Sequence, residues 1–235
     1  MLYTISMIPQ KIHYFWFGRG EKTELEKKCI ERFRAYAPNF EIKEWNEDTF
    51  DISLHPYTKA AYAEKKWAFV ADYARLKVLY DEGGIYLDTD MYLLKDITPL
   101  LEHTAFLGKE DEVHLSAGII GMEPQNDYIA AVLTAYNSLE KRVPIPRILT
   151  DVYDSGTYNI HIYTQNYFYP YTAEEIHRFT GTNAPTESYA VHMWNYSWGN
   201  PLIRLAKKAR VHRILISITE KFGVKKILKK LLKSE

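Results

Sequence analysis

The stretch "AFVADYARLKVLYDEGGIYLDTDM", residues 68–91, decides the fold. Over residues 65–82 the apolar side chains recur at helical spacing, and the Gly-Gly pair that follows suits the end of a helix. An apolar strand is expected over 85–88, and it runs into Asp88 and Asp90. Residues two apart on a strand point to the same side, so the two carboxylates should converge. A helix that leads into a buried strand ending in polar groups is typical of an α/β protein.

On both sides of this stretch, strands and helices continue to alternate. An aromatic strand at 11–18, a helix at 21–37 and a short strand at 40–45 form a βαβ opening. In the second half, strands are expected at "AFLG" (105–108), "LSAGIIGM" (115–122) and "NIHIY" (159–163). A helix is expected at 126–140 and a Pro-containing loop at 143–150. This alternation predicts an α/β sheet flanked by helices, followed by a less regular part from 153 to 198.

Composition and charge predict one large domain with a distinct tail. The chain has 235 residues, 46% of them hydrophobic, and a formal net charge of zero. Residues 201–235 hold eleven Lys and Arg against two Asp and Glu, so the remaining body is acidic. We therefore expect a catalytic or binding domain over 1–200 and a basic tail over 201–235. An acidic body argues against a nucleic-acid footprint that spans the protein.

The tail has the pattern of a basic amphipathic helix. Over 222–233, apolar residues follow the i, i+3, i+4, i+7 spacing and lysines fill the opposite face. Such a helix either lies on an anionic membrane surface or docks on the acidic body of its own protein. No run approaches the roughly 18–20 apolar residues of a membrane span, and Cys29 is the only cysteine. The first residues lack the features of a signal peptide. We expect a cytoplasmic protein whose membrane contact, if any, is peripheral.

Two pairs of charged residues are candidates for binding a metal ion or a ligand. Asp88 and Asp90 would repel each other unless a cation lies between them, and carboxylates at a strand end suit Mg²⁺ or Mn²⁺. The alternative is a pair of loop aspartates that cap a turn. Upstream, Asp72 and Arg75 share one face of the expected helix, within an otherwise apolar run. They form either a surface ion pair or a site for a ligand that carries hydroxyl and phosphate groups.

These residues resemble a known family. The block at 68–91 is similar to the DXD signature of the family 32 glycosyltransferases, of their bacterial capsular-polysaccharide relatives and, more distantly, of the clostridial cytotoxins. Four further blocks match in the same order: "IPQKIHYFWFG" (8–18), "WNEDTF" (45–50), "NYFYPY" (166–171) and "VHMWNYSW" (191–198). The departures are Ala117, where relatives often carry asparagine, and Ala71, where they commonly carry serine.

The resemblance implies a glycosyltransferase-A fold, a Rossmann-like mixed sheet that uses Mn²⁺ or Mg²⁺ to hold a nucleotide-sugar donor. On that pattern Asp72, Arg75, Asp88 and Asp90 form the catalytic group, in which Asp72 and Arg75 hold the donor sugar. Metal and ribose contacts would come from Asp88 and Asp90. Trp16 would stack on the nucleotide base, His13 would help to shape the base pocket, and Asn46 would contact the base. Ser197 and Trp198 would bind the donor from a closing flap. His192, in the same flap, would also bind the metal.

The function expected from these observations is a metal-dependent retaining glycosyltransferase. The resemblance favours a UDP-sugar donor, with GDP-mannose second, and a capsular or cell-surface glycan acceptor that is lipid-linked. Two other readings remain. An aspartate-based phosphatase also places D-x-D after a strand, and a degenerate relative would bind a nucleotide sugar without transferring it. On composition alone, Trp16 would be a core residue and His192 a structural histidine.

Overall fold

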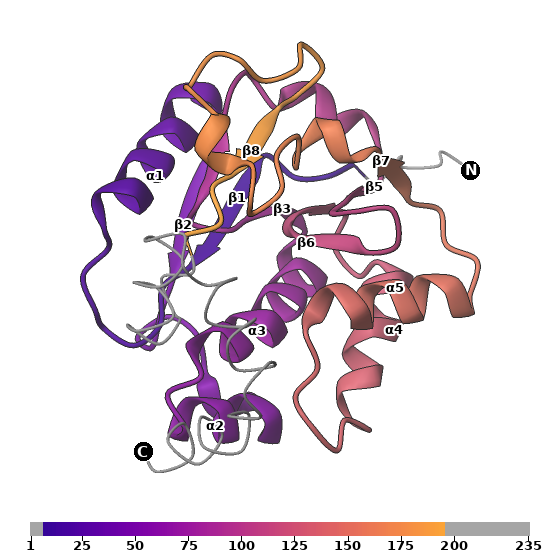
Figure 1. The fold of residues 1–235 in the computed structure, drawn as a ribbon. Helices are drawn as coiled ribbons and strands as arrows, with labels where there is room; N and C mark the ends of the chain where they lie inside the picture. The colour runs from indigo at the N-terminus through magenta and orange to yellow at the C-terminus, as the bar shows by residue number, and fades with distance from the viewer. Residues whose placement is uncertain (1–6, 196–235) are drawn as a thin grey trace, which may run out of the picture. The chain divides into compact units, whose positions relative to one another are not determined.

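The structure, a computed structural model, describes residues 7–195 and is built around a six-stranded mixed sheet (Figure 1). The strand order is β2-β1-β3-β6-β5-β7, with β1 parallel to both β2 and β3, β6 antiparallel to β3 and β5, and β7 parallel to β5. The strands are β1 (Lys11–Phe15), β2 (Glu41–Trp45), β3 (Gly84–Leu87), β5 (Ala105–Lys109), β6 (Leu115–Met122) and β7 (His161–Tyr163). The predicted α/β class is confirmed.

Helices cover both faces of the sheet (Figure 1). They are α1 (Glu24–Tyr36), α2 (Pro56–Ala63), α3 (Trp67–Glu82), α4 (Asp127–Tyr136) and α5 (Ile145–Ser155). The alternation of side chains along each strand divides the core in two. In β3, Tyr86 packs into the cluster formed with α2 to α5, whereas Ile85 and Leu87 pack into the cluster formed with α1. The sheet is therefore buried on both faces.

Helix α3 connects this core to the sheet edge that carries the polar residues. It ends at Glu82 and is capped by Gly83, whose φ is +62°, and Gly84 follows with φ +104°. A Cβ at Gly83 would lie 2.8 Å from atoms of Pro124, and one at Gly84 would lie 2.9 Å from a carbonyl oxygen of β1. The Gly-Gly pair thus allows the chain to reverse tightly from α3 into β3.

One sequence prediction about a loop is wrong. Residues 143–150 were expected to form a Pro-containing loop, but α5 begins at Ile145 and runs to Ser155. Pro144 is the N-cap of this helix and Pro146 lies in its first turn, where the missing N–H of proline would have no intrahelical partner. The prolines therefore start a helix here. Helix α2, which was not predicted, also begins with a proline, Pro56.

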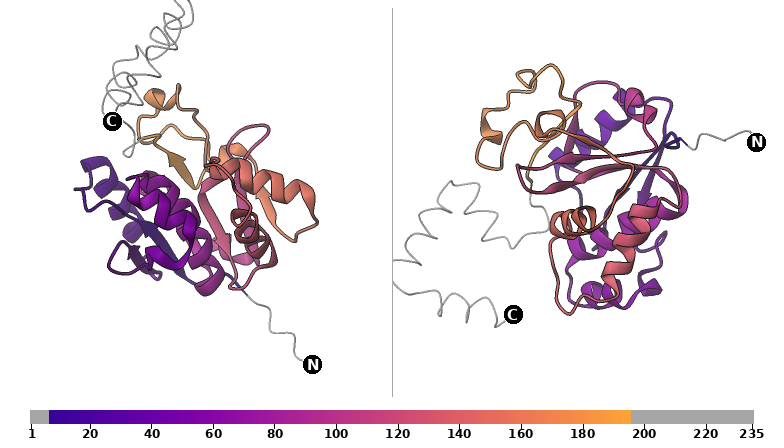
Figure 2. Two further views of the ribbon diagram at one scale, coloured as in Figure 1. Left: turned by 90° about the horizontal axis from the view of Figure 1, so that it is seen from below. Right: turned by 90° about the vertical axis from the view of Figure 1, so that its right-hand side faces the viewer.

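A second, two-stranded sheet joins distant segments of the chain. Strand β4 (Met91–Leu93) pairs antiparallel with β8 (Ala190–His192). Between β7 and β8 the chain has short 3₁₀ turns and little regular structure, as predicted, and this segment lies on the opposite side of the main sheet from α4 and α5 (Figure 2). The predicted tail at 201–235 and its helix at 222–233 lie outside the described residues. Within 7–195, no helix is long and apolar enough to cross a membrane.

Candidate active site

Asp88 and Asp90 converge, but through a turn and not along a strand. Strand β3 ends at Leu87, and the N–H of Met91 donates to the carbonyl of Asp88 (3.0 Å), which closes a tight turn over the two aspartates. The expected strand alternation is therefore wrong at this point. The turn also explains why β4 can start at Met91 and leave the main sheet.

His192 reaches this turn because β4 pairs with β8. In that pairing Met91 lies opposite His192, a residue about a hundred positions later in the chain. His192 Nε2 is 3.2 Å from Asp90 Oδ1 and 3.9 Å from Asp88 Oδ2. The three side chains each offer one ligand atom, and these atoms all lie within 4.8 Å of one another. Sequence reasoning placed these three residues together on a metal, and the structure does bring them together.

The charges in this cluster stabilise one another. Burial by itself would raise the pKa of the Asp90 carboxyl, but His192 and the backbone N–H of Asn195, which donates to Asp90 Oδ2 (2.8 Å), outweigh it and lower the pKa. Burial would lower the pKa of His192, and the carboxylates of Asp90, Asp88 and Glu110 reverse this and raise it. Among the described residues, His192 Nδ1 is buried without a hydrogen-bond partner.

Arg75 links the two predicted pairs. Its Nη1 donates to Asp88 Oδ1 (3.2 Å) and to the carbonyl of Ala117 (2.8 Å), while Nη2 donates to Asp72 Oδ1 (2.8 Å). The guanidinium also lies 4.3 Å from the ring centroid of Tyr86. Both Asp72 and Arg75 are buried, so the surface ion pair considered from the sequence is wrong. The Nε of Arg75 donates to the carbonyl of Ala71 (3.2 Å), so this buried guanidinium has four acceptors and orients both carboxylates.

Asp72 has an unusual environment for a carboxyl group. Burial raises its pKa to about 7, although Arg75 acts in the opposite direction and Asp88 adds to the rise. One carboxyl oxygen accepts from Arg75. A buried carboxyl with a raised pKa at a polar sheet edge is characteristic of functional sites.

Trp16 and Asn46 lie at the same edge of the sheet. They directly follow β1 and β2, and Asp88 directly follows β3, so the three residues come after the carboxyl ends of three adjacent parallel strands. The backbone N–H of Trp16 donates to the carbonyl of Trp45 (2.8 Å), which fixes the two ends side by side. Ligands of open α/β sheets bind in this position. The Trp16 side chain is half-buried, and Asn46 Oδ1 accepts from the N–H of Asp48 (2.9 Å).

His13 lies below this edge and contacts only protein. Its side chain is fully buried, Nε2 is 2.9 Å from the carbonyl oxygen of Gly83, and Nδ1 accepts from Trp45 Nε1 (3.1 Å). The first contact requires Nε2 to carry the proton and the second requires Nδ1 to lack one, so the ring is a neutral tautomer. His13 is thus positioned to support the β1–β2 edge from beneath.

The structure adds residues that sequence reasoning missed. The hydroxyl of Tyr86 donates to Asp88 Oδ1, and burial keeps the pKa of Tyr86 well above its usual value, so this tyrosine stays a donor. The hydroxyl of Tyr169 accepts from the N–H of Gly118 (2.9 Å), and its ring centroid is 5.2 Å from that of His192. Tyr86 stands two residues before Asp88, and Tyr169 lies in the aromatic block at 166–171, but neither position by itself marks a function.

Ser197 and Trp198, which were predicted to bind the donor, lie outside the described residues. Ala117, which stands where relatives often carry asparagine, contributes its carbonyl oxygen to Arg75. The next residue, Gly118, has room for no side chain, because a Cβ there would lie 2.4 Å from the Tyr169 hydroxyl and 3.0 Å from Asp88 Oδ2.

The donor set fits a hard divalent cation. Asp88 and Asp90 contribute carboxylate oxygens, and His192 contributes an imidazole nitrogen in the same small volume. Oxygen ligands suit Mg²⁺ and Mn²⁺, and one imidazole is compatible with Mn²⁺. Both carboxylates also accept hydrogen bonds from the protein, Asp88 from Tyr86 and Arg75, and Asp90 from the backbone N–H of Asn195. Such outer hydrogen bonds commonly orient metal ligands.

Comparison with known proteins identifies the region that contains this turn. Residues 23–107 match the family described as "Glycosyltransferase sugar-binding region containing DXD motif". The D-x-D of that description corresponds here to Asp88, Thr89 and Asp90. Residues 23–107 are therefore similar to a glycosyltransferase sugar-binding region.

Individual relatives agree with this assignment. An uncharacterized glycosyltransferase, L373, of Acanthamoeba polyphaga mimivirus is 27% identical over 90% of this chain and 92% of its own length. A human alpha-1,4-N-acetylglucosaminyltransferase is 28% identical over 66% of this chain, which spans only about half (51%) of that enzyme. The solved structure of PaToxG glycosyltransferase superposes with a TM-score of 0.51 at 21% identity, covering 63% of this chain and 69% of the other. The predicted glycosyltransferase-A fold is confirmed.

Proposed function

We propose that this protein is a metal-dependent, retaining glycosyltransferase that takes a hexosyl or N-acetylhexosaminyl group from a nucleotide sugar. The observation that carries the proposal is the convergence of Asp88, Asp90 and His192, tied through Arg75 to the buried carboxyl of Asp72. A UDP-sugar is the favoured donor. The favoured acceptor is a capsular or cell-surface glycan on a lipid carrier. Both preferences come from the resemblance to family 32 and its capsular relatives.

The arrangement assigns a task to each part of the site. Asp88, Asp90 and His192 would hold Mn²⁺ or Mg²⁺, which would neutralise the charge that builds on the leaving diphosphate. The fixed positive charge of Arg75 adds to this field from the side of Asp88. Asp72 would accept a hydrogen bond from a hydroxyl of the donor sugar, and Trp16 and Asn46 would border the nucleotide.

Transfer with retention can proceed on one face of the sugar. In the route that we favour, the acceptor oxygen bonds to the anomeric carbon on the side from which the nucleoside diphosphate leaves. A phosphate oxygen of the leaving group takes the proton of the acceptor hydroxyl. Arg75 then stabilises the departing anion. A covalent glycosyl-enzyme trapped on any carboxylate of this site would contradict the route.

A thermal-shift and hydrolysis screen tests the proposed function. Wild type and Asp90→Asn are compared with a panel of nucleotide sugars, each with and without Mn²⁺. We expect one nucleotide sugar to stabilise the wild type in the presence of metal, and Asp90→Asn to lose this response. Asp96→Asn, an exposed aspartate that only caps the turn at Thr98, is the matched control. A wild type that responds to no nucleotide sugar would favour the aspartate-based phosphatase, and one that is stabilised without hydrolysing any donor would favour a degenerate binding protein.

Location and tail form a separate part of the proposal. We place the catalytic domain within residues 1–200, in the cytoplasm, and assign peripheral contact with anionic membranes to the lysine-rich pattern at 222–233. The test is flotation with anionic liposomes before and after deletion of residues 222–235. Flotation that does not change on deletion would exclude the membrane role of the tail.

A further inference from the structure

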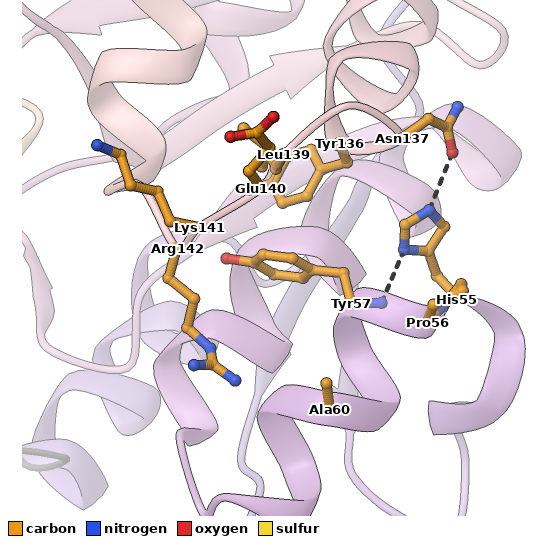
Figure 3. Close-up of a pocket in the computed structure, with 10 residues that line it drawn as sticks. All are labelled: His55, Pro56, Tyr57, Ala60, Tyr136, Asn137, Leu139, Glu140, Lys141 and Arg142. Carbon is orange, nitrogen blue, oxygen red and sulfur yellow. Dashed lines mark hydrogen bonds between the residues drawn. The ribbon is translucent and has the colours of Figure 1, made fainter.

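A pocket separate from the aspartate turn opens between α2 and the segment that follows α4 (Figure 3). Its volume is about 470 Å³, within the roughly 300–1,000 Å³ of small-molecule sites. The residues that line it are His55, Pro56, Tyr57, Ala60, Tyr136, Asn137, Leu139, Glu140, Lys141 and Arg142. Two aromatic rings and several hydrogen-bonding groups therefore surround one small space.

The aromatic wall of this pocket is held rigidly. Tyr57 and Tyr136 meet edge to face with ring centroids 4.9 Å apart, and Tyr136 meets Tyr73 in the same way at 5.4 Å. His55 stacks on Tyr73 at 4.5 Å, accepts from the N–H of Tyr57 at Nδ1 (3.1 Å) and contacts Asn137 Oδ1 through Nε2 (3.0 Å). These contacts preorganise the wall, and rings fixed in this way offer faces to the C–H groups of a sugar.

Two hydroxyl groups of the wall lack partners. Within residues 7–195, the hydroxyls of Tyr57 and Tyr136 are buried and make no hydrogen bond. The Tyr136 side chain is almost completely buried (2% exposed). In Figure 3 the ring of Tyr57 extends across the pocket, with its hydroxyl directed toward the side where Lys141 and Arg142 lie. A buried hydroxyl without a partner is destabilising, so its retention at a pocket points to a ligand that completes its hydrogen bonds.

The charges around the pocket balance. Arg142 is neutralised by Glu64, with Nη2 and Oε1 2.5 Å apart, and Glu140 stands next to Lys141 in the lining. His55 has the neutral tautomer that its two hydrogen bonds require. A pocket without net charge favours a neutral polar ligand over a phosphate or a carboxylate.

The pocket adjoins the proposed donor site through Asp72. Tyr73, the neighbour of Asp72 on α3, packs against Tyr136. The negative charge of Asp72 also acts on both hydroxyls of the wall, where it adds to the effect of burial in raising the pKa of Tyr57 and of Tyr136. A ligand in the pocket would therefore lie next to the carboxyl group that we assign to the donor sugar.

We propose that this pocket is a carbohydrate subsite that holds a neutral hexose or N-acetylhexosamine of the acceptor glycan. The assignment to an acceptor rests on the proposed function. Tyr57, which is half-buried, supplies the apolar ring face, and Tyr136 packs behind it. The two hydroxyls without partners supply hydrogen bonds, Asn137 supplies a polar group at the rim, and Arg142 closes the side nearest Glu64. The subsite lies outside the Asp88–Asp90–His192 cluster.

Tyrosine-to-phenylalanine variants test the subsite. Tyr57→Phe and Tyr136→Phe each remove a hydroxyl that has no protein partner, so the melting temperature should stay constant or rise. Binding of sugars should weaken by about tenfold for each lost hydrogen bond. The probes are methyl glycosides of glucose, galactose, mannose and N-acetylglucosamine, and lactose, observed by saturation-transfer NMR with and without UDP and Mn²⁺. Tyr80→Phe, at the other end of α3, is the matched control.

Each outcome decides for or against the subsite. A glycoside that binds the wild type and Tyr80→Phe, and binds both pocket variants more weakly, supports it. The absence of wild-type binding throughout the panel overturns it, as does binding that both pocket variants retain in full. Loss of the metal-dependent response to nucleotide sugars in the pocket variants would assign the pocket to the donor and overturn the acceptor role. The proposed function is judged by nucleotide sugars and the subsite by glycosides, so the two can fail separately.

Discussion

Two histidines, His13, which is fully buried, and His192, whose side chain is 14% exposed, show how the same residue type can support the fold in one place and a site in another. Both ring nitrogens of His13 have protein partners, the Gly83 carbonyl and the Trp45 indole, and burial lowers its pKa. His192 Nε2 faces two carboxylates, its Nδ1 has no partner within 7–195, and those carboxylates raise its pKa against the effect of burial.

The difference lies in whether the protein completes the hydrogen bonds of the group. The environment of His13 is complete, so it stabilises the folded chain and offers nothing to a ligand. The cluster around His192 brings two carboxylates and an imidazole within 4.8 Å of one another, and a bound cation would stabilise the two carboxylates further. We infer that incomplete polar environments, rather than residue type, mark the sites of this protein.

The largest effect is expected from removing the guanidinium that supports the charged cluster. Arg75→Met would leave Asp72 and Asp88 without their buried partner, and breaking such a pair costs about 3–5 kcal/mol of the free energy of unfolding. Urea denaturation of wild type and variant measures the difference. Arg147→Met, at an exposed arginine of α5, is the control. A loss below about 1 kcal/mol in Arg75→Met would contradict a network that depends on this residue.

A smaller effect is expected when the cluster is displaced without losing a polar group. In Gly118→Ala the new Cβ meets the Tyr169 hydroxyl at 2.4 Å and Asp88 Oδ2 at 3.0 Å, and such overpacking costs about 1–3 kcal/mol. Thermal unfolding measures this loss, and the stabilisation by Mn²⁺ should shrink with it. Gly20→Ala is the control, because a Cβ there has no atom within 4 Å. Equal melting temperatures for the two variants would show that the close approach at Gly118 is not required.

The smallest effect concerns pH and His13. The folded-state pKa of His13 lies below its usual 6.5 because of burial, so the unfolded chain takes up a proton first as pH falls. The stability that neutral His13 provides is present above pH 6.5 and is lost as pH falls from there toward the folded pKa. The slope is at most about 1.4 kcal/mol per pH unit for one proton. Denaturation curves between pH 7.5 and 5 for wild type and His13→Gln measure it, and parallel curves would contradict the assignment.

The sequence predicted most of the sheet and of the charged site. The signals were local: helical spacing over 65–82, a Gly-Gly pair before a buried strand, and D-x-D after it. The α/β class and the elements around this stretch followed from those patterns. The prolines at 144 and 146 misled the prediction of α5, since proline breaks the interior of a helix but is compatible with its first turn.

Other features depend on contacts that no local pattern encodes. The position of His192 requires the pairing of β4 with β8, and the burial of Arg75 requires the Ala117 carbonyl of β6. The resemblance placed His13 at the nucleotide base and His192 on the metal, but the hydrogen bonds of His13 to Gly83 and Trp45 could not be predicted from it. The pocket at Tyr57 and Tyr136 joins residues about eighty positions apart and was not predicted at all.

The most direct test of the central claim is a Mn²⁺ titration followed by electron paramagnetic resonance, performed with UDP present on wild type and Asp90→Asn. We predict that the wild type binds one Mn²⁺ and that Asp90→Asn binds it at least about tenfold more weakly, while the variant still unfolds in a single cooperative transition. Equal Mn²⁺ affinity in the two proteins would show that Asp88, Asp90 and His192 do not form the metal site.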